Sequence, residues 1–269
     1  MISGDFSNKV EDIIRSVSAD VIMPRFGSLR SDQISEKSPG DLVTVADQEA
    51  EELLSEALQG LLPGSVVVGE ESVAADERIL GFVDGHDPVW LIDPIDGTRN
   101  FVNGSESFGV MVALLGDGVA NASWIWLPAH ERMYTAVRGQ GAFRNNTPID
   151  DAVVLKNPSE MSGTIKRRYL PAELNAQVSA AAAGFGSVDV GQFCAAVEYV
   201  NLAERSTDFV LYGRVFPWDH IPGALLVEET GGAVRWFDGS HYEHRANGFG
   251  ILAVADRPNW ESVAHVVLR

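Results

Sequence analysis

Two early segments of the chain place apolar residues every three or four positions, with polar residues between them. This spacing puts the apolar residues on one face of a helix, and it predicts helices over residues 7–22 and 44–61. The apolar positions are Val10, Ile13, Ile14, Val17, Val21 and Ile22 in the first segment and Ala50, Leu53, Leu54, Ala57, Leu58 and Leu61 in the second. Thr44 and Asp47 have capping-box spacing at the start of the second helix, and Pro63-Gly64 ends it.

Short apolar runs follow these helices and predict strands. In the first half the strands cover residues 66–68, 89–92, 108–115, 119–126 and 133–137, with Gly116-Asp117-Gly118 as a hairpin turn. In the second half we expect helices over residues 173–183, 193–204, 222–230 and from about 259, and strands over 209–212, 233–237 and 250–254. The order of these elements, with helices first, then a strand meander, then mixed helices and strands, predicts an α/β fold of stacked layers. It does not favour a doubly wound parallel sheet.

Composition limits the classes of partner. The chain has 269 residues, of which 45% are hydrophobic, and a net charge of −18. Such a chain can bury a substantial core, and it repels nucleic acid and anionic membranes. The N-terminus has no signal-peptide pattern and no apolar run is long enough to span a bilayer, so we expect a cytoplasmic protein. The single cysteine, Cys194, is expected to be a buried thiol.

The stretch WLIDPIDGTRNF, residues 90–101, carries the strongest chemical signal. Asp93 and Asp96 follow an apolar run, and Pro94 between them is expected to end the strand. Two carboxylates this close repel each other unless a cation or a shared proton intervenes. Gly97-Thr98 is expected to open a helix, whose first backbone N–H groups can bind an anion. A cation site beside an anion site is what phosphoryl chemistry requires.

Four other acids stand where they could join this site. Glu70 and Glu71 follow a strand, Asp219 precedes a predicted helix, and Asp47 opens one. Each also has a plain structural explanation, since Asp is a good residue at a helix start and adjacent glutamates are usually solvated.

Several motifs together resemble the inositol monophosphatase family of Mg²⁺-dependent phosphomonoesterases. They are KSPGDLVTVADQEAEELL (37–54), GEES (69–72), WLIDPIDGTRNF (90–101) and WDHIPGALLVEETGG (218–232), in the family's order. The resemblance implies a single domain over residues 1–269 that folds as an alternating α-β-α-β-α sandwich and forms a homodimer. It places the metal-site half at about residues 1–150 and the substrate half at about 151–269.

The resemblance also implies roles for individual residues. About two or three Mg²⁺ ions would be bound. The implied ligands are all oxygen donors, which Mg²⁺ prefers. The implied metal ligands are Glu70, Asp93, the carbonyl of Ile95, Asp96 and Asp219. The implied catalytic residues are Thr98, Asp47 and Glu70, with Thr98 oriented by Asp47 to hold the attacking water. The implied substrate contacts are Gly97, Thr98, Asp96, Ala195, Tyr212 and Lys37, the last on a mobile loop.

Two departures from the family pattern bear on the substrate. Tyr212 stands seven positions before Asp219, where inositol phosphatases carry an acid that contacts inositol hydroxyls. After Asp219 the chain reads His220-Ile221-Pro222-Gly223, with Pro222 expected in the first turn of a helix. His220 either lines the pocket or only starts that helix.

The run KRRY at residues 166–169 is a second open question. It is either a solvated surface run or a place where Arg167 or Arg168 reaches a second anionic group of the substrate. Phe185, Phe193 and Tyr199 are expected in the core.

The leading hypothesis is therefore hydrolysis of a small phosphorylated metabolite. Inositol phosphate or a similar polyol phosphate ranks first, then histidinol phosphate or a sugar bisphosphate, then a 3′-phosphonucleotide. A non-catalytic, metal-dependent regulator with this fold is the alternative from another class, and the complete set of acids argues against it. An RNA-binding role for KRRY is disfavoured by the net charge of −18.

Overall fold

The computed structural model describes residues 2–244 and 248–268 and contains two β-sheets and a separate hairpin. The seven-stranded sheet has the order β3-β4-β5-β6-β7-β8-β9, the five-stranded sheet has the order β11-β10-β12-β14-β13, and β1 pairs with β2. The strands are β1 (Ile34–Ser38), β2 (Asp41–Thr44), β3 (Val66–Gly69), β4 (Val89–Asp96), β5 (Gly109–Gly116), β6 (Val119–Leu127), β7 (Arg132–Val137), β8 (Gly141–Arg144), β9 (Thr147–Pro148), β10 (Ser162–Lys166), β11 (Ser187–Asp189), β12 (Phe209–Tyr212), β13 (Ala233–Trp236) and β14 (Ile251–Val254). The α-helices are α1 (Gly4–Val17), α2 (Val45–Leu61), α3 (Glu70–Ala75), α4 (Thr98–Val102), α5 (Ala172–Ala181), α6 (Ala195–Ala203), α7 (Pro217–Glu229) and α8 (Trp260–Leu268).

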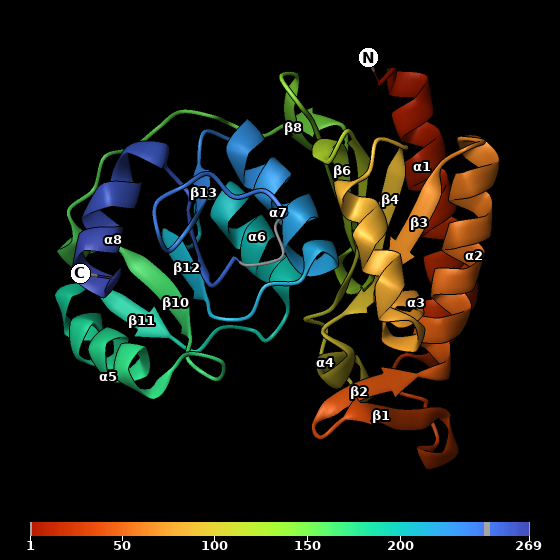
Figure 1. Cartoon of the computed structure of the whole chain (residues 1–269), viewed down its shortest axis with the longest axis horizontal. Helices are drawn as coiled ribbons and strands as arrows, with labels where there is room; N and C mark the ends of the chain where they lie inside the picture. The colour runs from red at the N-terminus through yellow and green to blue at the C-terminus, as the bar shows by residue number, and fades with distance from the viewer. Residues whose placement is uncertain (1, 245–247, 269) are drawn as a thin grey trace.

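Helices and sheets alternate in five layers (Figure 1). Helices α1 and α2 cover the outer face of the seven-stranded sheet, α6 and α7 lie between the sheets, and α5 and α8 cover the outer face of the five-stranded sheet. Each interface has its own apolar core, built around Trp90 and Trp124 in the first, Tyr199 and Leu225 in the second, and Trp260 in the third. The predicted α-β-α-β-α sandwich is confirmed.

The strand predicted over residues 89–92 continues to Asp96, so the expectation that Pro94 ends it was wrong. On one side β4 pairs with β3 only as far as Ile92, and on the other its register with β5 shifts between Asp93 and Asp96. Pro94 therefore occupies a position where no ladder hydrogen bond is required of it. The irregularity therefore lies between the two aspartates of the motif.

Helix α7 begins earlier than the predicted helix over residues 222–230. Pro217 is its first residue, because a fixed φ and a missing N–H cost nothing there. Asp219 consequently lies in the first turn instead of before the helix, and Pro222 lies inside the helix instead of in its first turn. Pro222 cannot donate to the carbonyl one turn earlier, which leaves that bond of the helix unmade.

The other boundaries differ less from the predictions. The segment predicted over residues 7–22 is α1, with Ser3 accepting from the Phe6 N–H at its start, followed by a π-helical turn over Ser18–Ile22.

Phe185 and Tyr199 are buried as expected, but Phe193 is 61% exposed. Its φ of 56° places the backbone in the left-handed region and turns the ring outward. No helix within the described ranges is both long enough and apolar enough to cross a membrane.

Candidate metal centre and phosphate site

The turn from β4 into α4 presents the DPIDGT residues at one end of a cavity of about 430 Å³. The Ile95 N–H donates to Asp93 Oδ1 over 3.0 Å, which fixes the Asp93 carboxylate against the strand. Gly97 caps α4 with a φ of 84°, and a Cβ there would lie 3.0 Å from the Ser107 carbonyl oxygen. Only glycine fits this turn without strain.

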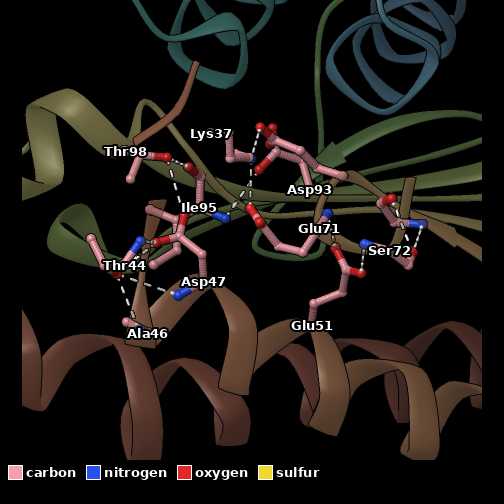
Figure 2. A network of polar contacts seen from close by, with 12 residues as sticks. Lys37, Thr44, Ala46, Asp47, Glu51, Glu71, Ser72, Asp93, Ile95 and Thr98 are labelled. Atoms are coloured by element: carbon pink, nitrogen blue, oxygen red, sulfur yellow. Dashed lines mark hydrogen bonds and ion pairs between the residues drawn. The ribbon is translucent and has the colours of Figure 1, made fainter. Parts of the chain in front are cut away.

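Asp47 joins this turn to the start of α2 (Figure 2). Its Oδ2 accepts from the Thr44 N–H at 2.8 Å and from the Thr44 hydroxyl at 2.6 Å, so Asp47 completes the expected capping box. Its Oδ1 lies 3.1 Å from Thr98 Oγ1, which is also 3.0 Å from the Ile95 carbonyl oxygen. The single hydroxyl proton of Thr98 can serve only one of these acceptors at a time. Burial raises the pKa of Asp47 to about 6.

Three carboxylates from distant parts of the sequence converge beside this turn. Glu70 at the start of α3, Asp93 in β4 and Asp219 in α7 each offer an oxygen atom, all within 4.8 Å of one another. Burial, followed by the charges of the neighbouring acids, raises the pKa of Asp93 and of Asp219 well above the usual range. Acids so placed repel each other without a cation, and their oxygens suit a hard divalent ion.

Asp96 stands apart from this group of three. Its Oδ2 accepts from the Ala196 N–H at 2.6 Å and lies 3.0 Å from Cys194 Sγ. Burial raises the pKa of Asp96 to about 6, although these two contacts oppose the rise. The residues at the start of α6 therefore hold one oxygen of Asp96 and fix its orientation.

Lys37 supplies positive charge at the edge of the acid group. Its Nζ donates to Glu70 Oε1 at 2.6 Å and to Glu71 Oε1 at 2.8 Å (Figure 2). Burial opposes protonation, but the charges of both glutamates outweigh it and raise the pKa of Lys37. Burial also raises the pKa of Glu71 to about 7. The predicted proximity of Lys37 to the site is found, and its contact with Glu71 was not anticipated. Lys37 lies in strand β1, not on a loop as expected.

The far wall of the cavity comes from the second sheet. Tyr212 ends β12 beside Lys166, which ends the neighbouring parallel strand β10. The Tyr212 ring lies 5.7 Å from that of Tyr199 and 4.6 Å from that of His220, and its hydroxyl is buried. Ala195, at the start of α6, lines the same wall.

His220 is part of this wall but is not suited to proton transfer. Its ring nitrogens lie 3.0 Å from the Tyr199 hydroxyl and 3.2 Å from the Arg214 carbonyl oxygen. Burial lowers the pKa of His220 to about 3, so the ring is neutral near pH 7. Its environment indicates a packing and hydrogen-bonding role.

Three comparisons with known proteins identify the family and the fold. Residues 9–266 match the model of the inositol monophosphatase family. The chain belongs to this family. It is 33% identical over 241 residues to an inositol-1-monophosphatase of Mesorhizobium japonicum, covering 84% of this chain and 81% of that protein. It is 32% identical over 225 residues to a histidinol-phosphatase of Chlorobaculum parvum, covering 83% of each protein. The solved IMPase of Thermotoga maritima matches with a TM-score of 0.78 and 26% identity, covering 98% of this chain and 95% of that one.

Membership in the inositol monophosphatase family confirms the recognition made from the motifs and the predicted enzyme class, a phosphoric monoester hydrolase. The family is generally metal-dependent, and the group of Glu70, Asp93 and Asp219 can hold a metal ion. The role assigned to each site residue stays a prediction. Geometry brings Asp47, Thr98 and Ile95 together as expected, while Asp96 lies outside the group of three acids.

Sequence reasoning missed a buried ion pair between β10 and α6. Lys166 Nζ pairs with Glu198 Oε1, which also accepts from the Gln192 N–H at 2.9 Å. Glu198 is 3% exposed, and its Oε2 has no hydrogen-bond partner in the described part of the chain. Glu198 follows Cys194 by one helical turn, so the helix predicted over 193–204 already placed it on the same face.

A second missed residue, Glu51 of α2, positions the start of α3. Its carboxylate accepts from the Glu71 N–H at 2.7 Å and the Ser72 N–H at 2.8 Å (Figure 2). These bonds fix the turn that carries Glu70. No local pattern reveals this contact, because 20 residues separate Glu51 from Glu71.

Glu51→Gln is expected to weaken Mg²⁺ binding by about 10–100-fold, the usual cost of losing a group that orients metal ligands. A neutral amide turns an N–H donor toward one of two backbone N–H groups, so one bond is lost. Isothermal titration with Mg²⁺ measures the effect. Glu52→Gln, at the exposed neighbouring position, is the matched control. Equal affinities for the two variants would contradict the positioning role of Glu51.

Proposed function

We propose that this protein is a Mg²⁺-dependent phosphatase that hydrolyses the phosphate monoester of a small metabolite with water as the nucleophile. One observation supports this most strongly: the Glu70, Asp93 and Asp219 carboxylates converge beside Thr98 and Asp47 at a helix start. Metal ions, a nucleophilic water and a phosphate group would all find suitable partners within this one cavity.

The donor set fits Mg²⁺. Glu70, Asp93, Asp96, Asp219 and the Ile95 carbonyl offer only oxygen atoms, which Mg²⁺ prefers. Burial, and then the charges of neighbouring acids, raise the pKa values of Asp93 and Asp219, and a bound cation would favour their ionised forms. About two or three ions would bind, as in other sites of clustered carboxylates. When bound, Mg²⁺ would supply Lewis acidity that lowers the pKa of water and neutralises the phosphate.

The protein's own groups would orient the reactants. Thr98 would accept a hydrogen bond from the attacking water or donate one to it, while Asp47 holds the Thr98 side chain in place from α2. A carboxylate with a pKa of about 6 such as Asp47 can also accept a proton near neutral pH. Glu70 would share the task of proton acceptor. The first backbone N–H groups of α4, from Gly97 and Thr98, would bind phosphate oxygens.

The proposed substrate is inositol phosphate or a related polyol phosphate. Histidinol phosphate, a sugar bisphosphate and a 3′-phosphonucleotide are the alternatives. Lys37, Asp96, Ala195 and Tyr212 are proposed to contact it. At position 212 a tyrosine replaces the acid that contacts the inositol hydroxyls in inositol phosphatases. We expect a different contact here, because a phenol cannot accept hydrogen bonds from two hydroxyl groups as a carboxylate does. The cytoplasmic location, the single domain and the homodimer stay predictions.

Phosphate release from a panel of monoesters, in Mg²⁺ and in EDTA, tests the proposal. The panel is inositol-1-phosphate, histidinol phosphate, fructose-1,6-bisphosphate, glycerol-2-phosphate and 3′-phosphoadenosine-5′-phosphate. We expect release from at least one compound in Mg²⁺ and none in EDTA. Mg²⁺ binding without release from any compound would favour a non-catalytic regulator with this fold.

A further inference from the structure

Four arginines line the mouth of the cavity that holds the acid group: Arg99, Arg167, Arg168 and Arg214. None of them forms an ion pair with a carboxylate of residues 2–244 or 248–268. Arg132, Arg138 and Arg257 likewise form no ion pair among the described residues, whereas Arg205 pairs with Asp256. What distinguishes the four arginines is that they line the same cavity. Arg167 turns away to donate to Ser179 Oγ at 3.1 Å. The side chains of Arg99, Arg168 and Arg214 instead contact residues at the mouth of the cavity.

Arg168 and Arg214 contact aromatic rings, and the charge of Arg214 also opposes the burial-driven rise in the pKa of Asp219. Both contact the ring of Tyr169, with the Cζ of Arg168 at 5.2 Å and that of Arg214 at 4.1 Å from its centroid. Arg214 also lies 4.7 Å from the centroid of Phe216. Stacking on a ring face orients a guanidinium but leaves its in-plane N–H donors available. Two preoriented cations therefore present free donors at the cavity mouth.

Arg99 and Arg168 approach each other across the hairpin between β1 and β2. A Cβ at Gly40 would lie 3.2 Å from Arg168 Nη2 and 3.3 Å from Arg99 Nη2, so both guanidinium groups reach the same point of the hairpin. Arg99 is anchored there, since its Nη2 donates to the Gly40 carbonyl over 2.6 Å. Like charges gathered at one place without a counter-charge repel each other, and an anionic ligand would relieve that repulsion.

The chain topology places these cations where a substrate would extend. Arg168 and Arg214 follow β10 and β12, two neighbouring parallel strands, and ligands of such sheets bind beyond the carboxyl ends of the strands. Arg99 follows Thr98, next to the proposed phosphate site. A small molecule whose reacting phosphate lies against α4 would thus have its other end near Arg168 and Arg214.

We propose that the substrate carries a second anionic group, a carboxylate or a phosphate, which binds Arg168 and Arg214 with Arg99 beside them. This inference rests on the proposed phosphatase function. It narrows the substrate class from simple polyol monophosphates, such as inositol monophosphate, to the alternatives that carry a second anionic group, such as a sugar bisphosphate. The reacting phosphate has the metal site and the α4 N–H groups, so the arginine cluster serves a different charge. Guanidinium groups bind carboxylate and phosphate through paired N–H donors, which explains why arginines rather than lysines fill these positions.

Matched substrates test the inference. Glycerol-2-phosphate and 2-phosphoglycerate differ by one carboxylate, and fructose-1-phosphate and fructose-1,6-bisphosphate differ by one phosphate. We expect kcat/KM to favour the compound with two anionic groups in at least one pair by about tenfold or more, as one charge-assisted contact suggests. The pair that shows the preference distinguishes carboxylate from phosphate. In Arg168→Gln/Arg214→Gln the ratio should fall toward one, mainly through KM, whereas Arg235→Gln on β13 should keep it.

A binding measurement without turnover separates this inference from the phosphatase proposal. The thermal shift caused by each compound is measured in EDTA for the wild-type protein and the double variant. A larger shift from the compound with two anionic groups, lost in the double variant, would support the arginine site even if no phosphate were released. Hydrolysis of both members of each pair with equal kcat/KM, and equal shifts, would overturn the inference while leaving the phosphatase function intact.

Discussion

Asp93→Asn is expected to lower Mg²⁺-dependent phosphate release by roughly 10²–10³-fold, the cost typical of removing one group that stabilises transition-state charge. Asp93 is 1% exposed, belongs to the group with Glu70 and Asp219, and is held by the Ile95 N–H. An amide keeps the shape of the side chain but removes the negative charge that would attract the metal ion. The loss should appear in kcat/KM on whichever compound of the panel the wild-type protein hydrolyses.

The same substitution is expected to stabilise the metal-free protein. The raised pKa of Asp93 shows that its charge is unfavourable in the folded state without a cation. Asp93→Asn should therefore raise the melting temperature in EDTA. It should also make the increase in melting temperature on adding Mg²⁺ smaller than in the wild type. Asp117→Asn, in an exposed hairpin turn, is the control and should change neither quantity. Unchanged hydrolysis by Asp93→Asn would rule out the metal centre as proposed here.

The order of layers was readable from the sequence, because long periodic segments bury one face whatever their neighbours are. Helix α2 illustrates this, since its apolar stripe and its Thr44 cap are local features. The boundary of a predicted element was wrong where pairing with a strand distant in sequence decides how far the element extends. Pro94 stays within β4 because pairing with β3 stops at Ile92 and the register with β5 shifts across Pro94, and neither feature is encoded near residue 94.

For the candidate site too, the sequence indicated the residues that are close together in the chain and missed those that only the fold brings together. Asp93, Asp96, Gly97 and Thr98 are close in sequence, and a single motif indicated them. Glu51 and the Lys166–Glu198 pair were missed, because their partners come from other elements and only the packed fold brings them together. Phe193 was wrongly assigned to the core, because the positive φ that turns it outward depends on the loop before α6.

The metal-free protein is expected to become less stable as pH rises from about 5 to 8. Asp47 and Glu71 have pKa values raised to about 6 and about 7, mainly by burial, from the values near 4 of exposed carboxyls. Between these limits the folded state holds more protons than the unfolded state, so the free energy of unfolding falls as pH increases. Asp47 and Glu71 together account for a loss of about 2–4 kcal/mol, or roughly 5–15 °C in melting temperature. Asp96, with its pKa raised to about 6, adds to this loss, and His220, with its pKa lowered to about 3, offsets part of it.

Thermal unfolding in EDTA across this pH range measures the effect, and Mg²⁺ should reverse it. Metal ions bind the deprotonated acids and stabilise the folded state, so the increase in melting temperature on adding Mg²⁺ should be larger at pH 8 than at pH 5. Glu71→Gln should flatten the pH dependence in EDTA, because it removes one of the buried acids that titrate in this range, while Glu52→Gln should leave it as in the wild type. A melting temperature that rises steadily from pH 5 to pH 8 in EDTA would show that the buried acids are compensated within the folded chain. The carboxylates would then have no need of a metal ion to balance their charge.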